Sequence, residues 1–294
     1  MVQYSVSRNN KQKPQKNDDL YEVMMIARKD GSITEPNNPF PVTIGGNGLS
    51  GGTISAKPWG LDVAQGNVTG HSFIHKFGAV PAMSQNQTGS VWDKNDTTYP
   101  WSAFDTAGTI SILTTAANGS TVTTDDGLSV VIQGLDSDYA PLTDTLSISG
   151  STATGTQSFK RVFRAYCTDG AGSNTSQIRM SRGATEVARI NIGKAQTLMG
   201  IYTVPAGKTG YLMQGTSSIQ AGADATGDLF VRYFGQDTFR VGHSFEVSGA
   251  GGYYNFSFGF PIPITEKSDI DVRASMRSNN ARLTVSFDML LVDN

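Results

Sequence analysis

The chain has 294 residues, of which 38% are hydrophobic and only 16% charged, and its formal net charge is −2. This length is enough to bury a core without disulfides, and the small net charge argues against whole-molecule attraction to nucleic acid or acidic membranes. Glycine is abundant, at 33 residues, but aromatic and β-branched residues recur after the first segment. The composition therefore favours packed strands with polar faces over disorder.

A basic segment opens the chain at residues 1–19. Its cations are Arg8, Lys11, Lys13 and Lys16. A segment of this composition buries too little apolar surface to fold alone, so we expect a solvated tail or an arm that docks on a neighbouring protein. Nucleic acid is the weaker alternative as a partner. The run 21–27 is a predicted strand, and the glycine-rich run 45–52 is a predicted hinge, so residues 1–52 form the predicted N-terminal arm and hinge.

Short apolar runs then alternate with turn signals, at the spacing typical of β-sandwiches. The predicted strands of this stretch are 109–113, 128–132, 146–149, 159–165, 187–192 and 198–204. Period-two alternation in the run 159–165 places Phe163 and Ala165 on the buried face and Val162 on the opposite face. Residues 204–210 resemble a phosphate-binding loop, but its first glycine is missing and a strand follows, so we predict a turn there.

The last third of the chain is rich in aromatic residues. Tyr254, Phe256, Phe258 and Phe260 alternate and are predicted to share one face of a strong strand. The prolines at 261 and 263 predict an edge, because each removes a ladder donor. A terminal strand is predicted over 283–289, and no helix longer than two turns is expected anywhere.

The predicted fold is all-β: an antiparallel β-sandwich or jelly-roll-like body of one or two units behind an extended N-terminal arm. The predicted domains are the arm and hinge (1–52), a β-sandwich unit (53–168), and a second β unit or continuation of the same sandwich (169–294). The glycine-rich run 169–174 is the candidate linker between the last two.

The search for a catalytic or metal site finds little, so we expect no catalytic residues, no metal, no cofactor and no enzymatic activity. His71 and His75 would lie about 13 Å apart on a strand, too far to share a metal. Asp125, Asp126, Asp136 and Asp138 are candidates for a calcium site, but they lack the EF-hand spacing, and Asp136 and Asp138 read more simply as turn-stabilising residues. The single cysteine, Cys167, reads as a buried strand thiol.

Three aromatic residues flank one loop and allow two interpretations. Trp92, Tyr99 and Trp101 either form a surface-binding loop on which sugars stack, or anchor the two ends of the loop in the core. The second interpretation is the favoured one.

Several sequence blocks in fixed order resemble a family of virion structural proteins of marine tailed bacteriophages, cyanophages among them. The blocks are LDVAQGNVTGHSFIHKFG (61–78), VWDKNDTTYPW (91–101), GLDSDY (134–139), SFKRVFRAY (158–166), YTVPAGKTGYL (202–212) and EKSDIDVRA (266–274). The resemblance implies a structural component of the virion, and we expect it in the tail, neck or fibre-attachment region. The alternatives are a capsid decoration protein and a host-receptor or glycan-binding β module.

The partners that follow are copies of the chain itself and other virion proteins, with a host surface glycan only under the receptor alternative. A closed homo-oligomer is expected, and a trimer suits a fibre-like part. Membrane insertion is not expected, because no apolar run is long enough to span a bilayer. The first residues lack a signal pattern, so we expect assembly into the virion in the host cytoplasm.

Overall fold

The computed structural model of this chain describes residues 58–168, 173–249 and 252–294. These residues belong to one compact unit, Lys57–Asn294. The predicted arm and hinge, with the predicted strand at 21–27 and the four arm cations, lie outside the described residues. No helix among the described residues is long and apolar enough to cross a membrane.

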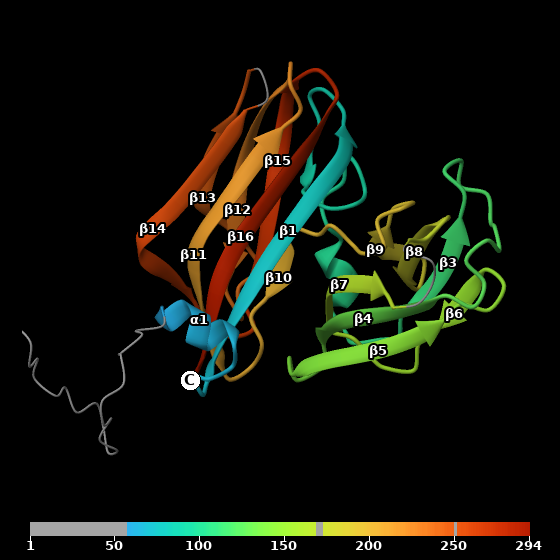
Figure 1. The fold of residues 1–294 in the computed structure, drawn as a ribbon, viewed down its shortest axis with the longest axis horizontal. Helices are drawn as coiled ribbons and strands as arrows, with labels where there is room; N and C mark the ends of the chain where they lie inside the picture. Colours follow the sequence, from blue (N-terminus) through green and yellow to red (C-terminus); the bar gives the residue numbers. More distant parts are fainter. Residues whose placement is uncertain (1–57, 169–172, 250–251) are drawn as a thin grey trace, which may run out of the picture. The chain divides into compact units, whose positions relative to one another are not determined.

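Sixteen strands make up nearly all the regular structure of the described residues (Figure 1). The exceptions are the short helix α1 (Trp59–Ala64) and one 3-10 turn, η1 (Trp101–Phe104). The first eight strands are β1 (His71–Met83), β2 (Thr88–Ser90), β3 (Ser111–Thr115), β4 (Ser129–Leu135), β5 (Pro141–Ser147), β6 (Thr152–Thr154), β7 (Arg161–Cys167) and β8 (Gln177–Arg182). The others are β9 (Thr185–Ile190), β10 (Ile201–Thr203), β11 (Lys208–Ile219), β12 (Asp224–Arg232), β13 (Arg240–Val247), β14 (Tyr253–Ile264), β15 (Asp269–Ser278) and β16 (Ala281–Asp293).

The strands form four antiparallel sheets. Their orders are β1-β16-β11-β14, then β10-β15-β12-β13 with β2 also paired to β15, then β6-β3-β8-β9, and β5-β4-β7. The prediction of an all-β, antiparallel fold is therefore confirmed. The finer prediction of a sandwich or jelly roll is not confirmed, because four small sheets also read as the blades of a four-bladed, propeller-like ring.

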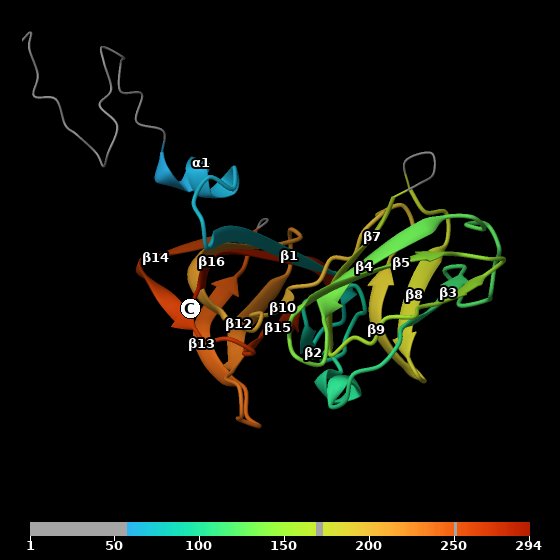
Figure 2. The same ribbon diagram turned by 90° about the horizontal axis from the view of Figure 1, so that it is seen from below.

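A first hydrophobic core is shared by the two sheets that contain β16 and β15. Buried and less buried residues alternate along β12 and most of β16, so that each strand turns one face to this core. Figure 2 shows the two sheets edge-on, with β1, β14 and β16 in one layer and β12, β13 and β15 in the other. Members of the first core include Met83, Leu212, Leu229, Val231, Val272, Val285 and Phe287.

A second hydrophobic core is built by the chain between β2 and β10. It draws on both smaller sheets and on the loop that precedes β3. Members of the second core include Trp92, Tyr99, Trp101, Phe104, Ile112, Ile132, Ala165, Met180 and Ile190. The chain therefore leaves the first core after β2 and returns to it at β10, so the second core is an insertion into the first body.

The predicted domain boundary at 168/169 does not coincide with a change of core. Strand β7 ends before it and β8 and β9 follow it, yet all three contribute to the second core. Strand β1 instead pairs with the last strand, from His71 opposite Val292 to Met83 opposite Ala281. The first body is thus built from the beginning and the end of the described chain, which meet where β1 pairs with β16.

Strand β7 departs from the predicted alternation. Val162 and Ala165 both lie in the second core, whereas Phe163 packs against Tyr202, with ring centroids 4.9 Å apart, and borders the first core. The register between β4 and β7 shifts between Gln133 and Gly134. A β-bulge adds one residue to the strand, so the side chains beyond it point to the opposite face of the sheet from the one that strict alternation predicts. The predicted faces of Val162 and Phe163 are therefore wrong.

Candidate interaction surface

Two edge strands border the same side of the first body. Strand β14 pairs only with β11, and β13 pairs only with β12, so each ends its sheet within the described part of the chain. Figure 1 shows β13 and β14 beside each other on this side. An edge strand presents unpaired backbone groups that can pair with another chain.

Aromatic rings fill the space between these two strands. The His243 ring of β13 lies 4.2 Å from the ring of Phe256 and 5.4 Å from that of Phe258, both of β14. The Tyr254 hydroxyl lies 3.3 Å from His243 Nε2. Burial among these groups lowers the pKa of His243, which favours the uncharged imidazole.

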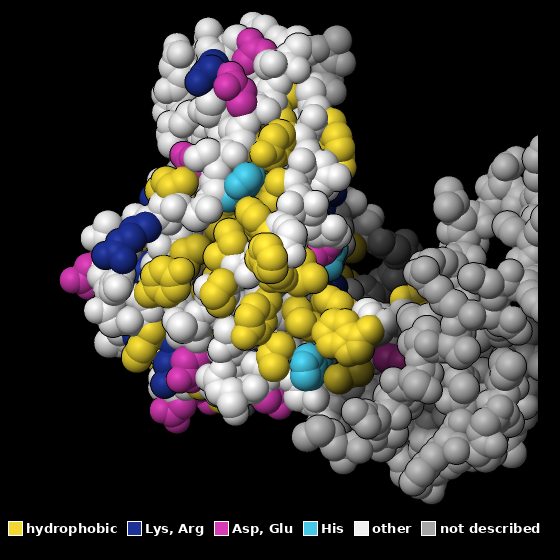
Figure 3. All heavy atoms as spheres, turned by 90° about the vertical axis from the view of Figure 1, so that its left-hand side faces the viewer, with side chains coloured by type: hydrophobic (Ala, Val, Ile, Leu, Met, Phe, Trp, Pro, Cys, Tyr) yellow, Lys and Arg dark blue, Asp and Glu magenta, His cyan; other side chains and the backbone are white. Residues whose placement is uncertain are grey.

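The outer part of the same region is apolar and exposed. Phe260 is 93% exposed, Tyr253 66% and Val241 53%. Strand β14 contains no charged residue. Figure 3 shows hydrophobic side chains gathered on this face of the molecule. We call the following set the aromatic surface: Val241 and His243 of β13, with Tyr253, Tyr254, Phe256, Phe258 and Phe260 of β14.

The exposure of Phe260 differs from the sequence prediction. The three rings at 254, 256 and 258 are half-buried, as a shared inner face requires, but Phe260 is exposed. In the pairing with β11, Gln214 lies opposite Ser257 and Leu212 opposite Ile262, so residues 258–261 have no paired partner there. This irregularity ends the alternation before Phe260, and the prediction is wrong for that residue.

The three aromatic residues of the predicted surface-binding loop are buried. Trp92 is 1% exposed, Tyr99 2% and Trp101 7%. Their polar atoms are bonded inside the protein: Trp92 Nε1 donates to the carbonyl of Thr97 at 3.0 Å, and Tyr99 Oη donates to that of Val162 at 3.1 Å. These rings anchor the loop in the second core and present no free face to a sugar. The arm cations Arg8, Lys11, Lys13 and Lys16 lie outside the described residues.

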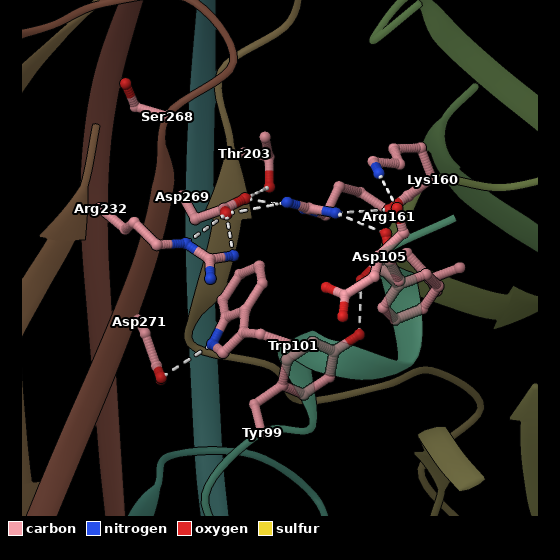
Figure 4. A network of polar contacts seen from close by, with 12 residues as sticks. Tyr99, Trp101, Asp105, Lys160, Arg161, Thr203, Arg232, Ser268, Asp269 and Asp271 are labelled. Carbon is pink, nitrogen blue, oxygen red and sulfur yellow. Dashed lines mark hydrogen bonds and ion pairs between the residues drawn. The ribbon is translucent and has the colours of Figure 1, made fainter. Parts of the chain in front are cut away.

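A buried ionic network joins the two cores (Figure 4). Asp269 of β15 accepts two hydrogen bonds from Arg161 of β7, at 2.8 and 2.9 Å, and another from Arg232 Nε at 3.1 Å. Thr203 Oγ1 also donates to Asp269, at 2.6 Å. Removing one member of such a buried network leaves an uncompensated charge, which is strongly destabilising.

The carboxylate of Asp271, beside this network, accepts a hydrogen bond from the side chain of Trp101. Trp101 Nε1 donates to Asp271 Oδ2 at 3.0 Å, and Arg273 Nε donates to the same oxygen at 2.8 Å. The sequence did not reveal either carboxylate as a junction residue. Arg161 and Asp269 are 108 residues apart, and no spacing rule connects positions that only the fold brings together.

The acidic residues considered for calcium bind protein donors instead. Asp125 accepts hydrogen bonds from the amide and hydroxyl of Thr175, both at 2.8 Å, and Asp136 accepts from the amides of Asp138 and Ala140. Burial raises the pKa of Asp125, but these bonds and those from Ser176 outweigh it and hold the pKa below its usual value. Within the described residues, no three His, Cys, Asp or Glu side chains are grouped to hold a metal ion.

Comparison with known proteins gives little. No protein-family model matches the chain, and no curated protein matches it. Five chains of solved structures match, one of them from the Cowpea mosaic virus top component, described as naturally occurring empty particles. That match has 8% sequence identity and a TM-score of 0.21, and it covers 65% of this chain and 84% of the other. Superposition at this TM-score does not establish a shared fold.

Proposed function

We propose that this protein is a non-enzymatic structural component of a tailed-phage virion, which assembles with copies of itself and with neighbouring virion proteins. The observation that carries the proposal is the aromatic surface, an exposed apolar patch on the open edge of the first body. The ordered sequence blocks that resemble virion proteins of marine tailed phages support the assignment to a particle.

The strands around the first core pair in a nested order. Eight strands surround the first core in the chain order β1, β2, β11, β12, β13, β14, β15 and β16. Counted from the two ends, they pair first with last: β1 with β16, β2 with β15, β11 with β14, and β12 with β13. Alternate pairs then join into sheets through β11 with β16 and β12 with β15. A long antiparallel ribbon rolled on itself produces this order, and we propose that the body is a jelly roll with β3–β10 inserted after its second strand.

Jelly rolls occur in viral capsid proteins, in lectins and in cupins, so the fold by itself does not select a function. The surface supports assembly. Large exposed apolar patches on a soluble protein mark interaction sites, and the aromatic surface is such a patch on an open edge. On the outer face of the adjoining sheet, Thr216 bonds Ser286 and Ser218 bonds Thr284, both at 2.7 Å, which adds uncharged polar groups to that face.

The proposed occupant of the aromatic surface is a second copy of this chain. Because β14 is uncharged, identical copies can approach through it without like-charge repulsion. The half of β14 before Pro261 is the part suited to strand pairing, since Pro261 and Pro263 cannot donate backbone hydrogen bonds. A contact of β14 with β14 is isologous and builds a two-fold dimer, whereas the trimer expected for a fibre-like part requires β14 to meet a different surface of the next copy.

Sedimentation of the purified full chain tests the contact. We expect an oligomer for the wild type and a monomer for the double variant Tyr253→Ser/Phe260→Ser. The control is Phe234→Ser, which removes another exposed ring, 57% exposed, outside the aromatic surface. A monomeric wild type at tens of micromolar, or a double variant that assembles like the control, would contradict the proposal.

Copy number in purified particles tests the position in the virion. On the order of ten copies supports the tail, neck or fibre attachment, where rings and small symmetric assemblies occur, whereas hundreds of copies support capsid decoration. Absence of the protein from purified particles would contradict the virion assignment itself.

A further inference from the structure

A polar cavity of about 270 Å³ opens beside the ionic network described above. It is bordered by the start of β7, the end of β12 with the loop after it, the turn before β15, and the β4–β5 loop. Sites for drug-sized ligands begin at roughly 300 Å³, so this cavity suits a smaller ligand of about one sugar ring. The residues that carry the argument are Tyr139, Lys160, Arg161, Arg232, Phe234 and Lys267.

The cavity offers cationic donors. Four cations line it, against three carboxylates, and the carboxylate of Asp269 is already engaged by two of the arginines. Arg232 uses Nε and Nη2 on Asp269, which leaves Nη1 without a partner among the described residues. Lys267 Nζ lies 5.1 Å from the centre of the Phe234 ring and has no hydrogen bond or ion pair within the described part of the chain. These free donors favour an anionic group.

The other two carboxylates favour a ligand that also has hydroxyls. Asp105 and Asp237 line the same cavity together with Gln236. Ionised carboxylates accept hydrogen bonds but repel a bare anion. A ligand that presents an acidic group to the cations and hydroxyl groups to these acceptors satisfies both sets.

Aromatic rings supply an apolar wall. Tyr139 and Phe234 meet edge to face, with ring centroids 5.8 Å apart, and Phe234 is 57% exposed. An exposed ring that is fixed by an edge contact offers its face to an apolar surface. The C–H face of a sugar ring has that character, whereas an inorganic anion does not.

The site is built before any ligand arrives. Tyr139 and Lys267 adopt left-handed backbone conformations, with φ of 64° and 61°, which non-glycine residues seldom adopt. Both are held: the carbonyl of Tyr139 accepts the amide of Ala206 at 3.0 Å, and the amide of Lys267 donates to Val204 at 2.7 Å. Strained residues fixed in this way cluster at binding sites.

We propose that this cavity binds one acidic sugar residue, carboxylated or sulfated, of a glycan. Lys267 and Arg232 hold the acidic group, Phe234 stacks against the ring, and Asp105 and Asp237 accept its hydroxyls. The site is separate from the aromatic surface, so it adds a binding function to the proposed assembly function.

Titration of the full chain by calorimetry and ligand-observed NMR tests the proposal with four probes: methyl β-D-glucuronide, glucose 6-sulfate, methyl β-D-glucoside and inorganic sulfate. We expect a millimolar Kd for at least one acidic sugar, and at least tenfold weaker binding of the glucoside and of sulfate. A preference for the first or second probe identifies the acidic group. Equal binding of the glucoside, equal binding of sulfate, or no binding of either acidic sugar overturns the proposal.

Variants place the binding in this cavity. We expect Phe234→Ala and Lys267→Ala each to weaken binding of the acidic sugar about fivefold or more, with circular dichroism unchanged because both side chains are at the surface. Phe260→Ala is the matched control and should bind like the wild type. Wild-type affinity in both cavity variants overturns the site. Oligomer formation, measured on the same samples, reports separately on the proposed assembly function.

Discussion

Two aromatic clusters of this protein have opposite environments. The first, formed by Trp92, Tyr99 and Trp101 in the second core, is at most 7% exposed. The aromatic surface around Phe256, by contrast, combines half-buried rings with the 93% exposed Phe260. As sequence, both stretches are rich in aromatic residues, with three between positions 92 and 101 and five between positions 253 and 260. What separates them is their place in the sheets, since the first is enclosed by two sheets and the second borders two edge strands.

Because of this difference, the buried cluster contributes to the stability of the fold and the exposed cluster to interaction with a partner. A buried ring stabilises the folded chain because folding removes its apolar surface from water. An exposed ring gains this free energy only when a binding partner covers it. Polar atoms follow the same division. The indole nitrogens of Trp92 and Trp101 are bonded inside the protein, and Asp271 gives Trp101 its acceptor. Variants in the two clusters should therefore affect different measurements.

The largest effect is expected for Trp101→Ala. It empties a buried site, removes a donor from Asp271 and takes away the ring over which Arg161 and Arg232 lie, each 5.6 Å from its centroid. We expect the free energy of unfolding in urea to fall by about 3–5 kcal/mol. Phe260→Ala is the control and should stay within about 0.5 kcal/mol. A loss below about 1 kcal/mol for Trp101→Ala would show that the ring is not a core anchor.

An intermediate effect is expected for Phe256→Ala. Its ring is half-buried against His243, so we expect a loss of about 1–2 kcal/mol in unfolding free energy, together with weaker self-association by sedimentation. Phe256→Leu keeps most of the apolar volume and should recover much of the stability. If Phe256→Ala lowered stability as much as Trp101→Ala, the contrast between the two clusters would fail.

The smallest effect is expected from the titration of His243. Burial lowers the pKa of His243 in the folded chain below its ordinary value near 6.5. As the pH falls through that value the unfolded chain takes up a proton that the folded chain still resists, so stability falls until the folded pKa is passed. A contact between copies that buries the His243 ring further should likewise weaken as the pH falls.

The measurement compares Tm and oligomer mass at about pH 7.5 and about pH 5 for the wild type and for His243→Gln, which has no proton to gain in this range. We expect a smaller acid-induced loss in the variant. An identical loss in both proteins would show that His243 does not contribute to the pH dependence.

Local pattern predicted much of the fold. Strands β3, β4, β7, β9, β14 and β16 each overlap a run predicted from alternation and turn residues, because the period of two in a strand is written in neighbouring positions. The predictions failed where extra residues interrupt pairing: Phe163 is one extra residue of β7, and Phe260 lies among the residues 258–261, which have no partner on β11. A bulge depends on the partner strand, and the partner is not visible in the run itself.

The sequence by itself determined that this protein is all-β, that its strands carry polar faces, and that its aromatic residues concentrate in two stretches. Only the tertiary structure decided that β1 pairs with β16, that a second core is inserted between β2 and β10, and that one aromatic stretch is enclosed while the other borders an edge. It also joined Arg161 to Asp269 and formed the cavity beside them. The physical reason is that alternation is a property of adjacent residues, whereas burial, ion pairing and cavities depend on which distant segments meet.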